Sequence, residues 1–414
     1  MPDIIPEPVE AKRYLSRKAV VETERWDDLK HGEHAHAFTV AHSRNAGVLD
    51  DIFDLLNTAM AEGKSFNSFK KEMRGLMEEK NWYGRSDKGK DDKAYINWRT
   101  KLIYNVNMRT AYEAGRYRQQ VRGAELRPIW EYVSKLEGKN RREDHIALHG
   151  KAFRWDDPFW QTNYPRNGWG CQCSVITLSE AGAERLGVEV LKSDPDGNPP
   201  ALADHNGNAV DWAKFAPPEW KYNPGLETLA PSFGNFKGLA NYRMPDGRTA
   251  LAHVADRYRR DMDTTRLTEN EFRVLLNRVQ QPDFMPSDIP LQVGNLERTR
   301  HEAMIKTGGS FDSKTMATTR SLRHSTLAKV EGQKVPADQQ VLFYRMFSSP
   351  QRIYENLIPK SPHLGREFHF VNDPRDGKVI KIVFRQQNSS SSLKLETIGK
   401  VEDEYRGPNY ERIF

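Results

Sequence analysis

The chain has 414 residues, which is too long for a single hydrophobic core and predicts two or three domains. Its net charge of +6 permits contact with nucleic acid, but a solvated basic surface has the same charge. No apolar run is long enough to span a bilayer and the N-terminus lacks the apolar core of a signal peptide, so we expect no membrane anchor. With only two cysteines, we expect free thiols in a reducing compartment.

The first part of the chain is predicted to be helical. Apolar residues recur every three or four positions over 49–63, 65–82 and 95–121, the period of an amphipathic helix. Gly63 fits a C-terminal helix cap and Ser65 an N-terminal one. The expected apolar faces are Leu49, Ile52, Phe53, Leu56 and Met60, then Phe66, Phe69, Met73, Leu76 and Met77, then Trp98, Leu102, Val106 and Tyr112.

The pattern changes after Pro128. Residues 128–135 alternate as a strand does, and residues 142–150 predict a short helix that stops at Gly150. The stretch 191–246 is rich in Pro, Gly and Asn, which is typical of an irregular connector rather than of a folded core.

The last part of the chain is predicted to be a separate domain. Residues 250–280 predict one or two helices, and short strands are predicted over 341–349, 366–373, 378–387 and 392–401. Helices followed by a run of strands favour an α+β domain with an antiparallel sheet. The fold class is therefore α+β, with a helical region at 1–125, a compact His- and Cys-containing α+β core at 126–190, a connector at 191–246 and a C-terminal α+β domain at 247–414.

Both cysteines, Cys171 and Cys173, stand one residue apart behind a run of Pro, Gly and Trp. This spacing does not favour a disulfide, so a metal site, a redox role or two packed thiols remain. His145 and His149 lie four residues apart and would share one face of a helix. Two imidazoles and two thiolates suit tetrahedral Zn²⁺. The alternative is that His149 caps the turn at Gly150 and the thiols fill a core.

The segment around these residues resembles the phage head morphogenesis family, the Mu F-like minor head proteins. The matching positions are Arg142, His145, Gly150, Trp155, Asp156, Asp157, Pro158, Pro165, Asn167, Gly168, Cys171 and Cys173. The resemblance covers residues 25–180, and it departs from the family at Gln172, where Arg is common between the cysteines. Because the pattern keeps His145 with both cysteines, the resemblance strengthens the case for zinc at His145, His149, Cys171 and Cys173.

The resemblance implies a minor protein of the virion that acts in head morphogenesis. It implies portal and capsid proteins as partners, a place in the capsid interior or neck, assembly in the host cytoplasm, and packaged DNA held by non-specific electrostatics. No catalytic residues of the family carry over to this part of the chain. The apolar faces of the predicted helices would then pack on one another or on a portal.

The C-terminal domain resembles, in its order of elements, the barnase, EndoU and colicin nuclease modules that accompany some of these head proteins. This resemblance implies a second hypothesis, a virion-delivered ribonuclease or toxin that cleaves RNA without a metal. An acid–base group and cations that hold phosphate would be needed. The candidates are His324, Arg345, Arg385 and Thr397, and the alternative for His324 is an exposed residue ahead of a helix.

Overall fold

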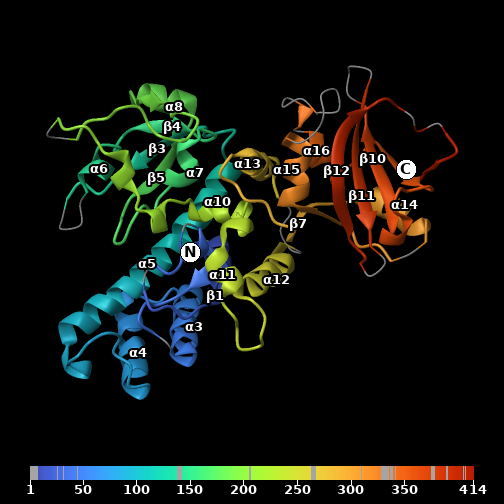
Figure 1. Cartoon of the computed structure of the whole chain (residues 1–414). Helices are drawn as coiled ribbons and strands as arrows, with labels where there is room; N and C mark the ends of the chain where they lie inside the picture. Colours follow the sequence, from blue (N-terminus) through green and yellow to red (C-terminus); the bar gives the residue numbers. More distant parts are fainter. Residues whose placement is uncertain are drawn as a thin grey trace, which may run out of the picture. The chain divides into compact units, whose positions relative to one another are not determined.

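The structure is a computed structural model that describes residues 8–414 except 26, 31, 44, 138–141, 205–206, 263–266, 309, 328–334, 336–338, 341, 374–377, 388–389, 404 and 406. The chain forms two compact units, which are taken separately below (Figure 1). Unit 1 comprises 1–231 and 236–254, and unit 2 comprises 232–235 and 255–414. Helices predominate at the N-terminus and a large sheet lies in unit 2, so the predicted α+β class is confirmed.

The N-terminal half of unit 1 is a helical bundle. Its main helices are α1 (Val9–Ser16), α3 (Ala46–Glu62), α4 (Phe66–Glu79) and α5 (Lys93–Arg122). A short parallel pair, β1 (Ala19–Val20) and β2 (Ala37–Phe38), lies beside α2 (Glu33–His36), and a 3-10 helix, η1 (Gly89–Asp91), precedes α5.

The caps that end these helices are the predicted ones. Gly63 ends α3 in the left-handed conformation at φ +64°, and the Ser65 hydroxyl accepts a hydrogen bond from Ser68 N at the start of α4. Ile52, Phe69 and Met73 are fully buried in one cluster with residues of α1 and α5. The apolar faces of α3 and α4 therefore pack on each other and on the rest of the bundle.

The second half of unit 1 has a small mixed sheet in the strand order β5-β3-β4-β6. The strands are β3 (Ile129–Val133), β4 (Ala152–Arg154), β5 (Ser174–Leu178) and β6 (Val190–Leu191). The short helices beside them are α6 (Glu143–Ile146), α7 (Phe159–Asn163) and α8 (Glu180–Arg185). The strand predicted at 128–135 is confirmed as β3, whose Trp130 is fully buried.

The Pro/Gly-rich stretch 191–246 contains short helical elements and buried side chains. The elements are α9 (Trp212–Phe215), η2 (Pro218–Trp220), α10 (Pro224–Leu229), η3 (Phe233–Asn235) and α11 (Lys237–Asn241). Helix α10 packs against α5, and Leu226 and Leu229 are buried. Proline at the first position of α10 and the Asn223 cap explain why a helix forms there.

Unit 2 is built on a sheet with the strand order β13-β9-β10-β11-β12-β8-β7 over the described residues. The strands are β7 (Pro290–Asn295), β8 (Lys314–Thr318), β9 (Arg352–Asn356), β10 (Arg366–Asn372), β11 (Val379–Gln386), β12 (Leu393–Val401) and β13 (Tyr410–Arg412). All neighbours pair antiparallel except β12 and β8. The helical elements are α13 (Glu269–Gln280), α14 (Arg298–Lys306), α15 (Thr319–Leu327), α16 (Leu342–Met346) and η5 (Pro362–Leu364), and α12 (Ala250–Met262) crosses the boundary from unit 1.

Three of the four predicted strands of unit 2 are confirmed as β10, β11 and β12. The strand predicted at 341–349 is wrong, because residues 342–346 form α16, while 341 lies outside the described residues. Phe343, Met346 and Phe347 are buried at a spacing of three and four, which is the period of a helix. No helix in the described part of the chain has the length and apolar character of a membrane span.

Candidate metal centre

The candidate metal centre lies between α6 and the loop that carries the two cysteines. Arg142 precedes α6, and its guanidinium donates to the Trp169 carbonyl at 2.8 Å, which ties the start of α6 to this loop. Gly168 has φ +156° and leaves room for the Arg142 guanidinium, which a Cβ at this position would meet. Arg142 and Gly168 thus bring His145 close to the cysteines.

His145, Cys171 and Cys173 form a buried group whose ligand atoms lie within 4.8 Å of one another. His145 Nδ1 is 3.3 Å from Cys173 Sγ and 3.7 Å from Cys171 Sγ. Cys173 Sγ also lies 3.5 Å from the hydroxyl of Ser134, just after β3. One imidazole nitrogen therefore faces both sulfurs.

A hydrogen bond at the other nitrogen of the imidazole, Nε2, indicates which nitrogen is available to a metal. His145 Nε2 is 3.1 Å from the carbonyl oxygen of Phe215, which can only accept a hydrogen bond. Nε2 therefore carries a proton, and in the neutral imidazole Nδ1 presents its lone pair to the sulfurs. A metal-binding histidine commonly donates its other N–H to a carbonyl in this way.

The two thiols differ electrostatically. A hydrogen bond from Cys173 holds the pKa of the Cys171 thiol well below its usual range, although burial opposes this effect. The same hydrogen bond and burial raise the pKa of the Cys173 thiol. The Arg166 guanidinium adds favourable charge near Cys171 and donates to the Cys173 carbonyl at 3.4 Å. A metal would displace the proton of any thiol that it binds, because it binds cysteine in the thiolate form.

His149 is not part of this group. Helix α6 ends at Ile146, so the helical spacing expected between His145 and His149 does not persist. His149 is exposed, and its Nδ1 accepts a hydrogen bond from Ser134 N at 3.2 Å. The donor set that fits a metal is one imidazole and two thiolates, and three protein ligands leave one position of a tetrahedral ion to another donor.

Phe215, whose carbonyl accepts the hydrogen bond from His145, lies in the Pro/Gly-rich stretch. The sequence predicts only a connector there, so no pattern indicated that this residue would contact the site.

The residues predicted as a nuclease site are dispersed in unit 2. His324 on α15 and Arg345 on α16 are exposed, whereas Arg385 on β11 is buried. Thr397 lies on the neighbouring strand β12, opposite Val383. Among the described residues, no hydrogen bond or ion pair joins any two of these four side chains.

Arg385 instead belongs to a polar cluster that sequence reasoning missed. Its Nη2 lies 2.7 Å from Glu367 Oε2, and His369 Nε2 lies 2.9 Å from Glu367 Oε1. His369 Nδ1 lies 2.9 Å from the hydroxyl of Tyr405, and Asn356 Nδ2 donates to Glu367 Oε1 at 2.8 Å. The hydrogen bond from His369 lowers the pKa of Glu367 to about 2, despite partial burial. One feature of the sequence could have indicated this cluster, since Glu367 and His369 alternate along one predicted strand and so share one face of it.

Comparison with known proteins shows what part of unit 1 is similar to. Residues 50–176 match the model of the family described as Phage Mu protein F like protein. The match spans α3, α4, α5 and the candidate metal centre.

Two curated relatives are similar to part of the chain. The chain is 38% identical over 189 residues to a protein of Escherichia phage Mu that bears the name capsid assembly protein F, covering 44% of this chain and 43% of that protein. It is 37% identical over 174 residues to the Mu-like prophage FluMu F protein of Haemophilus influenzae, covering 42% of each. The chain thus spans less than half the length of the curated relatives it matches. No solved structure matches it.

Proposed function

We propose that the protein acts in phage head assembly as a minor component of the virion. The observation that carries this proposal is the family match at residues 50–176, together with a relative named for capsid assembly. The partners are portal and capsid proteins, the final location is the capsid interior or neck, and assembly takes place in the host cytoplasm. Mass spectrometry of purified heads tests the proposal, since the full chain should be present in a fixed low copy number. Heads assembled normally without it would contradict the proposal.

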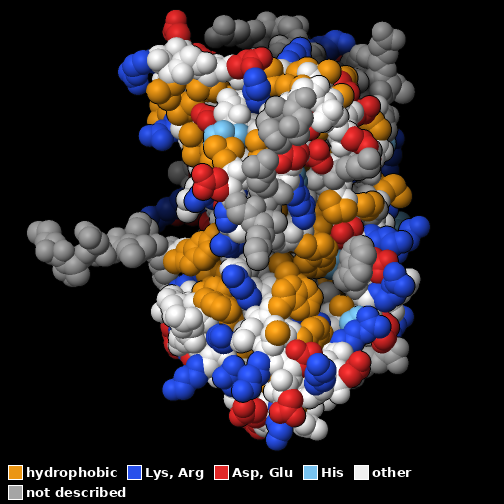
Figure 2. Space-filling model, turned by 90° about the vertical axis from the view of Figure 1, so that its left-hand side faces the viewer, with side chains coloured by type: hydrophobic (Ala, Val, Ile, Leu, Met, Phe, Trp, Pro, Cys, Tyr) orange, Lys and Arg blue, Asp and Glu red, His pale blue; other side chains and the backbone are white. Residues whose placement is uncertain are grey.

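Contact with packaged DNA is electrostatic and independent of sequence in this proposal. The net charge of +6 supplies attraction to phosphate. On the face shown in Figure 2, Lys and Arg side chains are interspersed with Asp and Glu side chains, which favours weak binding without a single basic stripe. Affinity of the full chain for duplex DNA should therefore collapse between about 50 and 200 mM salt. Affinity that stays constant over this range, or a strong sequence preference, would contradict this contact.

The metal is zinc in this proposal, bound by His145, Cys171 and Cys173. The buried pair of cysteines and the adjacent Nδ1 of His145 support it, because thiolate and imidazole are the preferred ligands of structural Zn²⁺. A bound ion would contribute to folding by fixing the cysteine loop to α6. Elemental analysis of the full chain, purified without chelators, should find about one zinc per chain. Metal-free protein whose Cys171→Ser variant folds normally would instead indicate packed thiols.

A ribonuclease activity of unit 2 is a second candidate, supported by the cluster of Glu367, His369 and Arg385. The pair of Glu367 and His369 would move protons, and Arg385 would stabilise the phosphorane charge. In this step the RNA 2′-oxygen attacks phosphorus and passes its proton to the carboxylate. The bond to the 5′-oxygen breaks, and that oxygen takes a proton from the imidazole, leaving a cyclic phosphate. His369 is only 2% exposed and lies against Tyr405 and Tyr410, so these rings must move for RNA to enter.

Incubation of the full chain with single-stranded RNA and EDTA tests this candidate. Cleavage should persist in EDTA, because no metal takes part, and should be lost in His369→Gln. His324→Ala separates the two assignments, since it should leave cleavage intact if the cluster acts and abolish it if His324 does. No cleavage by the wild-type chain would leave unit 2 without an enzymatic role.

A further inference from the structure

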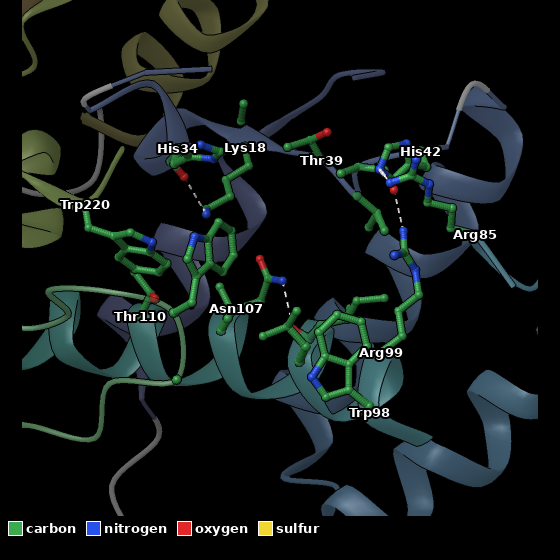
Figure 3. Close-up of a pocket in the computed structure, with 18 of the residues that line it drawn as sticks. Lys18, His34, Thr39, His42, Arg85, Trp98, Arg99, Asn107, Thr110 and Trp220 are labelled. Carbon is green, nitrogen blue, oxygen red and sulfur yellow. Dashed lines mark hydrogen bonds between the residues drawn. The ribbon is translucent and has the colours of Figure 1, made fainter. Parts of the chain in front are cut away.

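A pocket of about 660 Å³ lies in unit 1, outside the candidate metal centre. Figure 3 shows Trp98 and Asn107 of α5 on one side of it, with Lys18, His34 and Thr39 opposite and Trp220 at one end. This volume is that of a site for a few side chains or one small ligand. All of the lining residues belong to unit 1.

Three of the four residues of the predicted apolar stripe of α5 face this pocket and not the helical core. Leu102 and Val106 are half-buried and line the pocket, and Trp98 is 57% exposed at its rim. The core side of α5 is formed by other residues, among them Ile96 and Met108. A row of apolar side chains at helical spacing is therefore left without a covering element among the described residues.

The charge of the pocket has one sign. Arg85 and Arg99 line it, together with Lys18, whose pKa is lowered to about 7 by burial, and none of the described lining residues is acidic. Arg99 is 7% exposed, and among the described residues its guanidinium contacts neutral groups, the Tyr95 hydroxyl at 3.0 Å, the Ala41 carbonyl and the Trp82 ring. A buried cation without a carboxylate is costly, so an anion in this pocket would be strongly favoured.

Two residues that line the pocket, Thr110 and Trp220, each have a buried polar atom, Oγ1 and Nε1, that forms no hydrogen bond within the described part of the chain. The indole N–H can only donate, and the hydroxyl can donate as well. Buried donors in native proteins are nearly always paired, so these two point to a ligand that brings oxygen acceptors.

We propose that this pocket docks a peptide segment of another head protein, in which an apolar side chain is flanked by Asp or Glu. This rests on the proposed role in head assembly and adds the chemistry of the partner to it. The apolar side chain packs against Trp98, Leu102 and Val106, and the carboxylates pair with the cations. Nucleic acid is the less fitting occupant, because aliphatic side chains form much of the lining and the volume is too small for a duplex.

Fluorescence polarisation with the full chain tests the chemistry of the pocket. The probe is a fluorescein-labelled peptide Asp-Glu-Leu-Phe-Asp-Glu, compared with Asn-Gln-Leu-Phe-Asn-Gln and with a six-nucleotide oligothymidine. The acidic peptide should bind at least about tenfold more tightly than either comparison. Trp98→Ala should weaken this binding about 30-fold, as expected for a central tryptophan, and Arg85→Gln about fivefold. Equal binding of the three probes, or preference for the oligonucleotide, would overturn the proposal.

Matched control variants on α5 separate docking from folding. Tyr112→Ala and Lys101→Gln change exposed residues of the same helix outside the pocket, and both should leave affinity unchanged. Trp98→Ala and Arg85→Gln also change exposed side chains. A general folding defect would therefore lower the affinity of these two variants and of the controls equally.

Photo-crosslinking in assembling heads identifies the partner. With p-benzoylphenylalanine in place of Trp98, the crosslinked peptide should come from another head protein and contain an apolar residue between acidic ones. Crosslinks to nucleic acid or to a second copy of this chain would refute docking but not the role in head assembly. The same holds if no crosslinks form although the chain is present in heads. Absence of the wild-type chain from heads would refute that role itself.

Discussion

Glu367→Gln should destabilise unit 2 at neutral pH. The carboxylate accepts hydrogen bonds from His369 and Asn356 and pairs with Arg385, and all three contacts favour its charged form. The neutral amide keeps the shape of the side chain but leaves the buried Arg385 guanidinium without its closest carboxylate. Loss of one partner from a buried pair costs more than the pair itself contributes.

The size of the effect follows from the pKa of Glu367, which falls from 4.5 to about 2. A shift of this size corresponds to on the order of 3 kcal/mol of stability. Because the side chain is 12% exposed, solvent screens part of this contribution. We therefore expect a loss of about 2 kcal/mol at pH 7. A lowered pKa means that the contribution is complete above the unfolded value near 4.5 and disappears as pH falls towards about 2.

Amide hydrogen exchange of the full chain, measured on peptides from β10 and β11, reports this loss. Tryptophan fluorescence would not, because all nine tryptophans lie before residue 231, in unit 1. Glu411→Gln on β13 is the matched control, since this carboxylate is exposed and should change stability by less than about 0.5 kcal/mol. Equal destabilisation by Glu367→Gln at pH 3 and pH 7, or none at pH 7, would refute the reasoning.

Further predictions concern unit 1. His145→Ala should abolish zinc binding measured by elemental analysis, whereas His149→Ala should retain about one zinc per chain, because only His145 faces the sulfurs. Gly168→Ala should lower stability by about 1–3 kcal/mol in urea unfolding followed by tryptophan fluorescence, since a Cβ displaces Arg142 and φ is +156°. Ser65→Ala should cost about 1 kcal/mol in the same assay through loss of the α4 cap, and Ser65→Asp should restore it. Unchanged stability in either variant would show that these local contacts are compensated elsewhere.

The elements that could be predicted from the sequence are those with strong local signals. Helices α3 and α4 have a clear apolar period and caps at Gly63 and Ser65, and β10 to β12 have alternating apolar residues. The strand prediction over 341–349 is wrong because Phe and Tyr favour strands by propensity, whereas the buried residues of 342–347 follow a helical spacing. Strands as short as β13 owe their form to pairing with β9, which no local pattern encodes.

The candidate sites show the same division between local and distant information. The tight pair of cysteines and the nearby His145 were visible as a motif, but the carbonyl of Phe215 that sets the imidazole tautomer comes from 70 residues further along. The stripe of Trp98, Leu102 and Val106 was visible as a helical period, yet a period shows only that one face of a helix is apolar. Whether that face meets the core or a pocket depends on distant segments, here the loop after β2 and the turn at Trp220, which form other walls of the pocket. An apolar face that the fold leaves uncovered, beside a buried arginine without a carboxylate, is where a partner of this protein should bind.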